Sequence, residues 1–246
     1  MMNSYISVDL ETTGLNPKTD KIIEIGAVRI ENGVETGTFE TFVNPGRRLE
    51  EKIIALTGIT DSDLKDAPEI TEALPCFLEF AGELPLLGHS VLFDFSFLKK
   101  AAVNQKLTFE REGVDTLKIA RKYLAELPHR NLGYLCEYFD IPHQAHRALE
   151  DARATVCLYL KLQEQFETSN EMTEMSENEN VTESSLFIPS RLIYQAKKDS
   201  PITKHQKERL YKLILRHKID TVYDIDKLTK SEASRYTDQI LATYGR

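Results

Sequence analysis

The first forty residues alternate between apolar and polar positions in the manner of β-strands. The alternation covers residues 5–11 and 38–43, residues 22–30 are rich in branched side chains, and the turn signals Gly14-Leu15-Asn16-Pro17 and Asn32-Gly33 lie between these segments. The pattern predicts a three-stranded meander at the start of the chain.

After Pro45 the apolar positions follow the period of helices. Helices are expected over residues 69–82, 93–105, 116–125, 131–139 and 148–166, with a short buried strand at residues 85–89. Strands followed by interspersed helices are typical of an α/β domain with a mixed sheet flanked by helices, and we place this domain at residues 1–166.

Two segments of different composition follow this domain. Residues 167–186 are polar and acidic and carry few branched or aromatic side chains, so we expect an acidic flexible linker. Residues 187–246 are expected to form a small basic helical module, with helices that begin at Thr203 and Thr229. Thr229-Lys230-Ser231-Glu232 has the spacing of a capping box.

The net charge of −8 conceals an asymmetry along the chain. Residues 1–161 carry a charge of −7, residues 162–190 another −7, and residues 191–246 carry +6. Because Lys and Arg neutralise phosphates whatever the sequence, one prediction is that the basic module holds a nucleic-acid strand. A solvated helical surface or a protein-docking module explains the charge equally well.

The three cysteines, Cys76, Cys136 and Cys157, lie in apolar stretches without paired spacing. They are expected to be buried thiols in a reducing compartment, which excludes a thiolate metal site. No apolar run approaches the ~20 residues of a membrane-spanning helix, and the first thirty residues contain no secretory segment. We therefore expect a cytoplasmic protein with no membrane partner.

Two carboxylates, Asp9 and Glu11, stand two residues apart in the first predicted strand. Side chains at this spacing point to the same face of a strand, and neighbouring carboxylates resist burial unless a cation relieves their repulsion. Hard carboxylate oxygens suit Mg²⁺ or Mn²⁺. The alternative is a frayed strand end with two solvated acids.

Two further positions could contribute to such a site. Asp94 opens a predicted helix, where Asp is also a common N-cap. His146 and Asp151 lie five residues apart, which on one helix separates them by ~140°, so they share a cleft only if His146 precedes the helix. The ordinary alternative is a helix start with acidic residues near the positive end of the dipole.

Taken in order, these residues resemble the three motifs of the DEDDh family of 3′–5′ exonucleases. The motifs are Asp9-Leu10-Glu11-Thr12-Thr13-Gly14, a second segment at 88–98 that begins Gly88-His89-Ser90, and a third at 146–152 that begins His146-Arg147-Ala148. Residues 56–60, 115–117 and 132–141 add further similarity. Within this family the chain resembles the epsilon-type proofreading exonuclease of bacterial DNA polymerase III. The resemblance covers about residues 1–166 and implies a ribonuclease H-like fold.

The resemblance also implies a set of site residues. The expected ligands of two Mg²⁺ or Mn²⁺ ions are Asp9, Glu11, Asp94 and Asp151, and His146 is the expected general base toward the attacking water. The residues expected to bind the substrate are Thr12, Thr13, Thr57, His89 and Phe93. Ser90 and Thr57 stand where many members of the family have Asn and His, and neither is a metal ligand.

The activity implied is metal-dependent release of nucleoside 5′-monophosphates from the 3′ end of single-stranded DNA, in proofreading or repair associated with DNA polymerase III. One alternative is an exoribonuclease that trims RNA 3′ ends. Another is a polymerase or sliding-clamp accessory that uses the fold mainly for binding. Glu183-Ser184-Ser185-Leu186-Phe187 resembles a bacterial sliding-clamp motif, although the first position is normally Gln, and the simpler explanation is that Leu186 and Phe187 begin the helical module.

Overall fold

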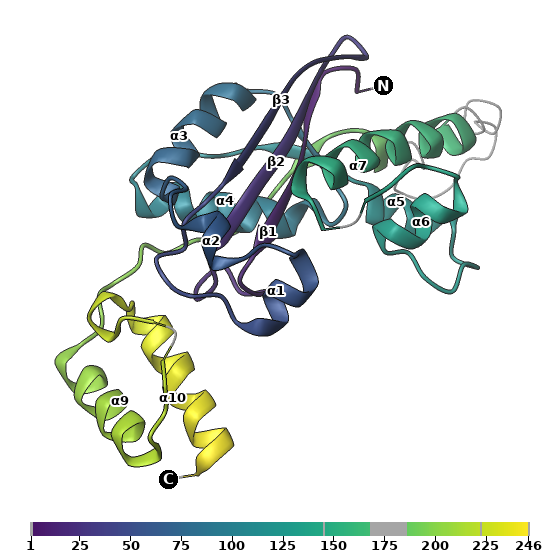
Figure 1. Cartoon of the computed structure of the whole chain (residues 1–246). Helices are drawn as coiled ribbons and strands as arrows, with labels where there is room; N and C mark the ends of the chain where they lie inside the picture. The colour runs from purple at the N-terminus through teal and green to yellow at the C-terminus, as the bar shows by residue number, and fades with distance from the viewer. Residues whose placement is uncertain (1, 145, 168–185, 222, 246) are drawn as a thin grey trace, which may run out of the picture.

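A six-stranded mixed sheet forms the centre of the α/β domain (Figure 1). The computed structural model describes residues 2–144, 146–167, 186–221 and 223–245. The strand order is β3-β2-β1-β4-β5-β6, in which β4 and β5 run parallel to β1 while β2, β3 and β6 run antiparallel to their neighbours. The strands are β1 (Tyr5–Thr12), β2 (Ile22–Glu31), β3 (Val34–Phe42), β4 (Leu86–Gly88), β5 (Glu112–Asp115) and β6 (Ser190–Arg191).

Helices cover both faces of the sheet (Figure 1). One face carries α3 (Ile70–Ala81) and α4 (Val91–Asn104), and the other carries α5 (Thr116–Tyr123), α6 (Leu132–Tyr138) and α7 (Ala148–Leu162). A π-type turn, η1 (Gln163–Glu167), continues α7. The mixed sheet flanked by helices confirms the predicted fold class.

The period-two pattern of β1 separates two apolar cores. Ile6, Val8 and Leu10 are buried against α3 and α4, whereas Tyr5 packs on the face that α7 covers. Because side chains alternate along a strand, Ser7, Asp9 and Glu11 share the α7 face with Tyr5. The same alternation therefore builds one core and presents two carboxylates toward α7.

Two short helices lie near the end of β1 and were not predicted. They are α1 (Glu51–Thr57) and α2 (Asp61–Leu64), and their apolar side chains pack with Ile23 of β2. Gly58 ends α1 with φ of 70°, a left-handed conformation that glycine adopts without steric cost. At four to seven residues each, these helices are too short for the apolar period to reveal.

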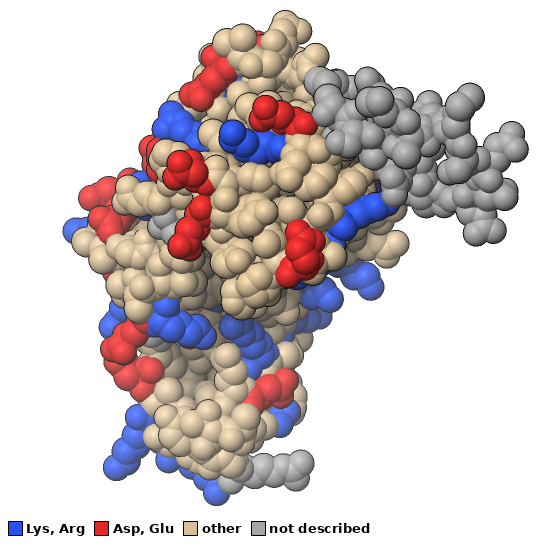
Figure 2. Space-filling model, turned by 90° about the vertical axis from the view of Figure 1, so that its right-hand side faces the viewer, with Lys and Arg blue, Asp and Glu red and all other residues tan. Residues whose placement is uncertain are grey.

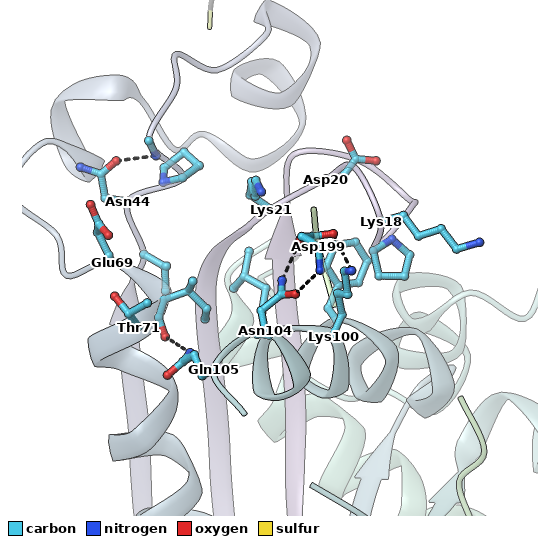
Figure 3. A pocket seen from close by; sticks show the side chains of 18 residues that line it. Lys18, Asp20, Lys21, Asn44, Glu69, Thr71, Lys100, Asn104, Gln105 and Asp199 are labelled. Carbon is cyan, nitrogen blue, oxygen red and sulfur yellow. Dashed lines mark hydrogen bonds and ion pairs between the residues drawn. The ribbon is translucent and has the colours of Figure 1, made fainter. Parts of the chain in front are cut away.

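The segment 186–199 packs on the α/β domain, although residues from 187 onward were predicted to belong to the helical module. Phe187 is fully buried beside the rings of Tyr123 and Tyr159, and β6 pairs with β5. Asp199 then accepts hydrogen bonds from Lys100 and Asn104 of α4 (Figure 3). The helical module therefore begins near residue 200, because these side chains find long-range partners that local periodicity does not reveal.

Other predictions for this part of the chain fall partly outside the described residues. Residues 168–185, which hold nearly all of the expected linker, are among those the structure does not describe, as are the first three residues of the clamp-like motif. Of the two described residues of that motif, Leu186 is half-buried and Phe187 lies in the core. The burial of Phe187 fits the simpler explanation, in which this pair serves packing.

The helical module consists of α9 (Lys204–His217) and α10 (Lys230–Tyr244), joined through a short turn, η3 (Ile225–Lys227). Both helices begin where predicted, and Thr229 forms the predicted capping box with Glu232; Thr203 forms a second capping box, with Gln206. The module lies beyond the β1–β2 loop, at the end of the sheet where β1 finishes (Figure 1). Lys and Arg side chains gather over the lower half of the face in Figure 2, where this module lies.

The burial of the cysteines was predicted correctly for one residue of three. Cys136 is buried, but Cys76 and Cys157 are exposed. Both exposed thiols lie on amphipathic helices, α3 and α7, at positions that face solvent although their sequence neighbours are apolar. None of the helices in the described part of the chain combines the length and the apolar character needed to span a bilayer.

Candidate active site

Three carboxylates from two elements converge at the end of β1. Asp9 and Glu11 come from β1, and Asp151 comes from the first turn of α7. Each offers an oxygen, and these oxygens lie within 4.8 Å of one another. The residues expected to hold metal from the first and third motifs are therefore brought together, although 140 residues separate them in the sequence.

Close approach of α7 to the sheet positions Asp151. A Cβ atom on Gly26 of β2 would lie 2.1 Å from backbone atoms of Ala148 and Leu149, so a glycine is required where the helix crosses this strand. Ser7 donates a hydrogen bond of 2.8 Å to the carbonyl oxygen of Ala152. The first turns of α7 therefore lie directly on β1 and β2, with Asp151 beside the two strand carboxylates.

A buried glutamate fixes the start of α7. Glu24 of β2 is fully buried, and its carboxylate accepts hydrogen bonds from the Ala148 amide at 3.2 Å and from the Arg147 guanidinium at 3.1 Å. Burial raises the pKa of Glu24, and the Ala148 and Arg147 donors oppose that rise. The sequence analysis missed this role, although an acid inside the apolar run Ile22-Ile23-Glu24-Ile25 was the signal for it.

Asp94 is not one of the three residues whose carboxylate oxygens converge; it lies beside this cluster. It is buried in the first turn of α4, and its Oδ1 atom accepts a 3.1 Å hydrogen bond from the Leu10 amide of β1. Burial raises the pKa of Asp94 well above its ordinary range, while its backbone hydrogen bonds lower it. Asp94 lies close enough to Asp9 that its negative charge raises the pKa of Asp9.

Burial and mutual repulsion destabilise the ionised carboxylates. Burial is the main cause of the raised pKa of Asp9, and the charges of Asp94, Asp151 and Glu11 add to it. The pKa of Glu11 rises to about 7, first through burial and then through Asp151 and Glu24, while Arg147 opposes the shift. A cation bound among these oxygens would remove the repulsion, so the donor set fits a divalent metal ion.

His146 lies before α7, the position that a shared cleft with Asp151 requires. Its φ of 67° is left-handed, α7 begins two residues later, and the His146 amide donates a 2.9 Å hydrogen bond to Asp151 Oδ2. The imidazole is exposed, with Nδ1 4.0 Å from Glu11 Oε1. The ring is therefore at the rim of the carboxylate cluster and open to solvent.

A second histidine, His143, was not identified from the sequence. Its side chain is 9% exposed, and Nε2 forms a hydrogen bond with Asp151 Oδ1. Both oxygens of Asp151 are thus engaged by the loop that precedes α7. The available signal was a histidine three residues before His146 in the same predicted loop.

Among the residues expected to bind substrate, four use their polar groups within the protein: Thr57, His89, Thr13 and Thr12. The Thr57 hydroxyl contacts the Ile53 carbonyl and the Ile59 amide at the end of α1. His89 Nε2 donates to the Arg130 carbonyl at 2.8 Å, and Nδ1 lies 2.9 Å from Thr116 Oγ1. Burial lowers the pKa of His89, which favours a neutral ring.

Thr13 is the third of these residues, and its hydroxyl accepts hydrogen bonds from Lys21 and Arg47. The Thr12 hydroxyl donates to the Gly14 carbonyl at 2.7 Å. Phe93 is half-buried in the first turn of α4, one residue before Asp94, with its ring 5.0 Å from that of Phe97. Of the five expected substrate residues, Phe93 alone offers an apolar surface beside the acidic site.

A separate cavity of about 270 Å³ lies between the β1–β2 loop and α4 (Figure 3). Lys18, Asp20 and Lys21 line it from the loop, and Lys100 and Asn104 line it from α4. None of the four expected metal ligands is among its lining residues. This cavity is therefore distinct from the carboxylate cluster.

Comparison with known proteins identifies the family. The model of the exonuclease family RNase_T matches residues 6–159, which include β1, α4 and α7. The chain is similar to DNA polymerase III PolC-type of Caldanaerobacter subterraneus subsp. tengcongensis (37% identity over 92% of this chain) and of Bacillus subtilis (33% over 97%). The chain belongs to this exonuclease family, and its similarity to the PolC-type relatives confirms the predicted resemblance to proofreading exonucleases.

The chain corresponds to a small part of these relatives. It spans 16% and 17% of the length of the two PolC-type proteins. Among solved structures, exonuclease X in complex with 5′ overhanging duplex DNA has a TM-score of 0.54 at 24% identity and covers 66% of this chain and 93% of that one. Exonuclease I has a TM-score of 0.60 at 19% identity, with 66% and 41% covered, so both likenesses concern the fold.

Proposed function

We propose that this chain is a metal-dependent 3′–5′ exonuclease that releases nucleoside 5′-monophosphates from single-stranded DNA ends. The convergence of Asp9, Glu11 and Asp151, with Asp94 buried beside them and His146 at the rim, is the observation that carries the proposal. The family of the chain supports hydrolysis of a phosphodiester. The polarity and the DNA substrate are part of the proposal.

Asp9, Glu11, Asp94 and Asp151 would hold two Mg²⁺ or Mn²⁺ ions. Bound divalent ions neutralise charge on the scissile phosphate, lower the pKa of a bound water and stabilise the leaving oxygen. The raised pKa values of Asp9, Glu11 and Asp94 mean that protons compete with cations for this site. Activity is therefore expected to need a neutral or mildly alkaline pH.

His146 is proposed to take the proton from the attacking water. The exposed ring lies at the rim of the cluster, and the His146 backbone amide is tied to Asp151, so the loop would hold the imidazole near a phosphate bound at this cluster. General bases of this kind contribute about 10²–10⁴-fold to rate. Thr12, Thr13, Thr57, His89 and Phe93 remain the predicted substrate residues, of which Phe93 is proposed to stack on a terminal base.

DNA is the proposed substrate because the similar full-length proteins are DNA polymerases by name. By the same argument, the proposed partner is a DNA polymerase III subunit or the remainder of a PolC-type chain. Contact with a sliding clamp is a weaker proposal, because Phe187 of the clamp-like motif is buried. The proposed cellular role is proofreading or repair.

The test is hydrolysis of matched single strands labelled at either the 3′ or the 5′ end, as DNA and as RNA. Mg²⁺ or Mn²⁺ should support stepwise shortening of the 5′-labelled DNA and immediate release of the 3′ label, and EDTA should abolish both. Asp9→Asn should be inactive, whereas Asp66→Asn, which changes an exposed acid outside the site, should keep full activity. Faster hydrolysis of RNA would identify an exoribonuclease, and metal-dependent binding without hydrolysis would identify a binding accessory.

A further inference from the structure

The helical module docks on the α/β domain through charged residues that are largely removed from solvent. Asp20 of the β1–β2 loop pairs with Arg235 of α10, and Glu232 of α10 pairs with Lys21 at 3.1 Å. The side chains of Asp20 and Glu232 are only 2% and 4% exposed. Burial of ionised groups is costly unless partners with well-defined geometry surround them, so these contacts specify one docked arrangement.

Arg47 lies at the centre of this interface. Its side chain is 9% exposed and lies 3.6 Å from both Asp20 and Glu232. One Nη atom donates a 2.6 Å hydrogen bond to the Tyr236 hydroxyl of α10, and the other donates to Thr13 Oγ1 at 2.6 Å and to the Thr19 carbonyl at 3.2 Å. A single guanidinium thus joins the helical module to both ends of the β1–β2 loop.

The loop that Arg47 holds continues directly from the metal-site strand. Thr13 follows Glu11 by two residues, and its backbone amide and hydroxyl both bond to Lys21, at 2.8 Å and 2.9 Å. Thr13 is therefore held through both its backbone and its side chain just beyond the strand carboxylates. The pairing of β1 with β2 shifts register between Glu11 and Thr12. The regular β-ladder is therefore interrupted at the end of the strand that carries Glu11.

We propose that Arg47 is a positioning residue for the metal site, and that the helical module holds it in place. Tyr236 and Glu232 fix the guanidinium, the guanidinium fixes Thr13, and Thr13 sets the orientation of the strand end that carries Glu11. The module is then part of the catalytic unit in addition to any role in holding a strand. This inference rests on the proposed exonuclease function.

The test compares Arg47→Gln with Arg48→Gln in the full chain. Arg48 is the adjacent residue, is exposed and has no ion pair or hydrogen bond in the part of the chain that the structure describes, so it is the matched control. Two substrates are used: a p-nitrophenyl ester of thymidine 5′-monophosphate, which is too small to reach the module, and a long DNA single strand. Mn²⁺ binding is measured by calorimetry, and thermal melting verifies that each variant is folded.

Arg47→Gln is expected to lower kcat about tenfold on both substrates, because a small displacement of catalytic groups has a large effect on rate. It should also weaken Mn²⁺ binding, and Arg47→Lys should restore only part of the loss because a single ammonium cannot reach all three acceptors. Tyr236→Phe removes one hydroxyl and should give a smaller loss of kcat. If Arg47→Gln does not fold, Tyr236→Phe supplies the same test.

Two results would overturn the inference. One is a folded Arg47→Gln or Tyr236→Phe variant whose kcat and Mn²⁺ affinity equal those of Arg48→Gln. The other is a loss confined to KM for the long strand, which would assign the module to strand binding alone. A wild-type chain that hydrolyses neither substrate with metal would instead overturn the proposed function itself.

Discussion

Replacement of Glu11 by glutamine should stabilise the metal-free protein, because the wild-type carboxylate is ionised in a place that disfavours its charge. Burial and the charges of Asp151 and Glu24 raise the pKa of Glu11 from 4.5 to about 7. A difference of this size corresponds to about 3 kcal/mol at a pH above both values. Glutamine has the same shape, but its buried amide keeps part of the desolvation cost, so a gain of about 1–3 kcal/mol is expected.

The sign of the effect sets its pH dependence. The folded state binds the Glu11 proton more tightly than the unfolded state, so the wild-type protein loses stability as pH rises from about 4.5 to about 7. Above about 7 the full penalty is present and the advantage of Glu11→Gln is largest. Below about 4.5 the carboxyl is protonated in both states, and the advantage disappears.

The assay is thermal unfolding in EDTA at pH about 8 and about 5, with Glu79→Gln as the control because Glu79 is exposed on α3. At the higher pH, Glu11→Gln should melt several degrees above the wild type, at about 2–4 °C per kcal/mol for a chain of this size. Addition of Mg²⁺ should reverse the order, because the wild type binds the ion and the variant binds it weakly. An equal gain at both pH values, or no gain at the higher one, would refute the reasoning.

Three further predictions concern the base, the helix contact and the segment that follows α7. His146→Ala should slow hydrolysis by about 10²–10⁴-fold at neutral pH while Mg²⁺ still raises the melting temperature, and full turnover would contradict the general-base role. Gly26→Ala should cost at least about 1–3 kcal/mol of unfolding free energy and reduce activity, since its Cβ would overlap the backbone of α7; an unchanged melting temperature would contradict this contact. Phe187→Ala should cost about 3–5 kcal/mol in urea unfolding, and a loss below about 1 kcal/mol would place the residue outside the core.

Local patterns were sufficient to predict most of the regular elements and the positions of the acidic residues within them. The alternation of β1 placed Asp9 and Glu11 on one face, the start of α9 was predicted at Thr203, and a capping box marked the start of α10. These features depend on residues close together in the chain, so a short window of sequence contains the information. The order of the three motifs then identified the family, which the match over residues 6–159 confirms.

Contacts between distant segments could not be predicted in this way. The pairing of β6 with β5, the burial of Phe187 and the exposure of Cys157 depend on which surfaces meet after folding. The role of Glu24 at the start of α7 is of the same kind, because its partners lie more than 120 residues away. A buried acid is visible in a sequence, but its partner is not.

The sequence by itself therefore determined the elements of the α/β domain, the acidic residues at the end of β1 and the basic character of the tail. Only the tertiary structure decided that α7 crosses Gly26 closely enough to bring Asp151 beside Asp9 and Glu11. It also decided that Arg47 joins the helical module to Thr13. Periodicity and caps follow from backbone geometry within a few residues, whereas these contacts follow from the packing of surfaces that meet only when the whole chain has folded.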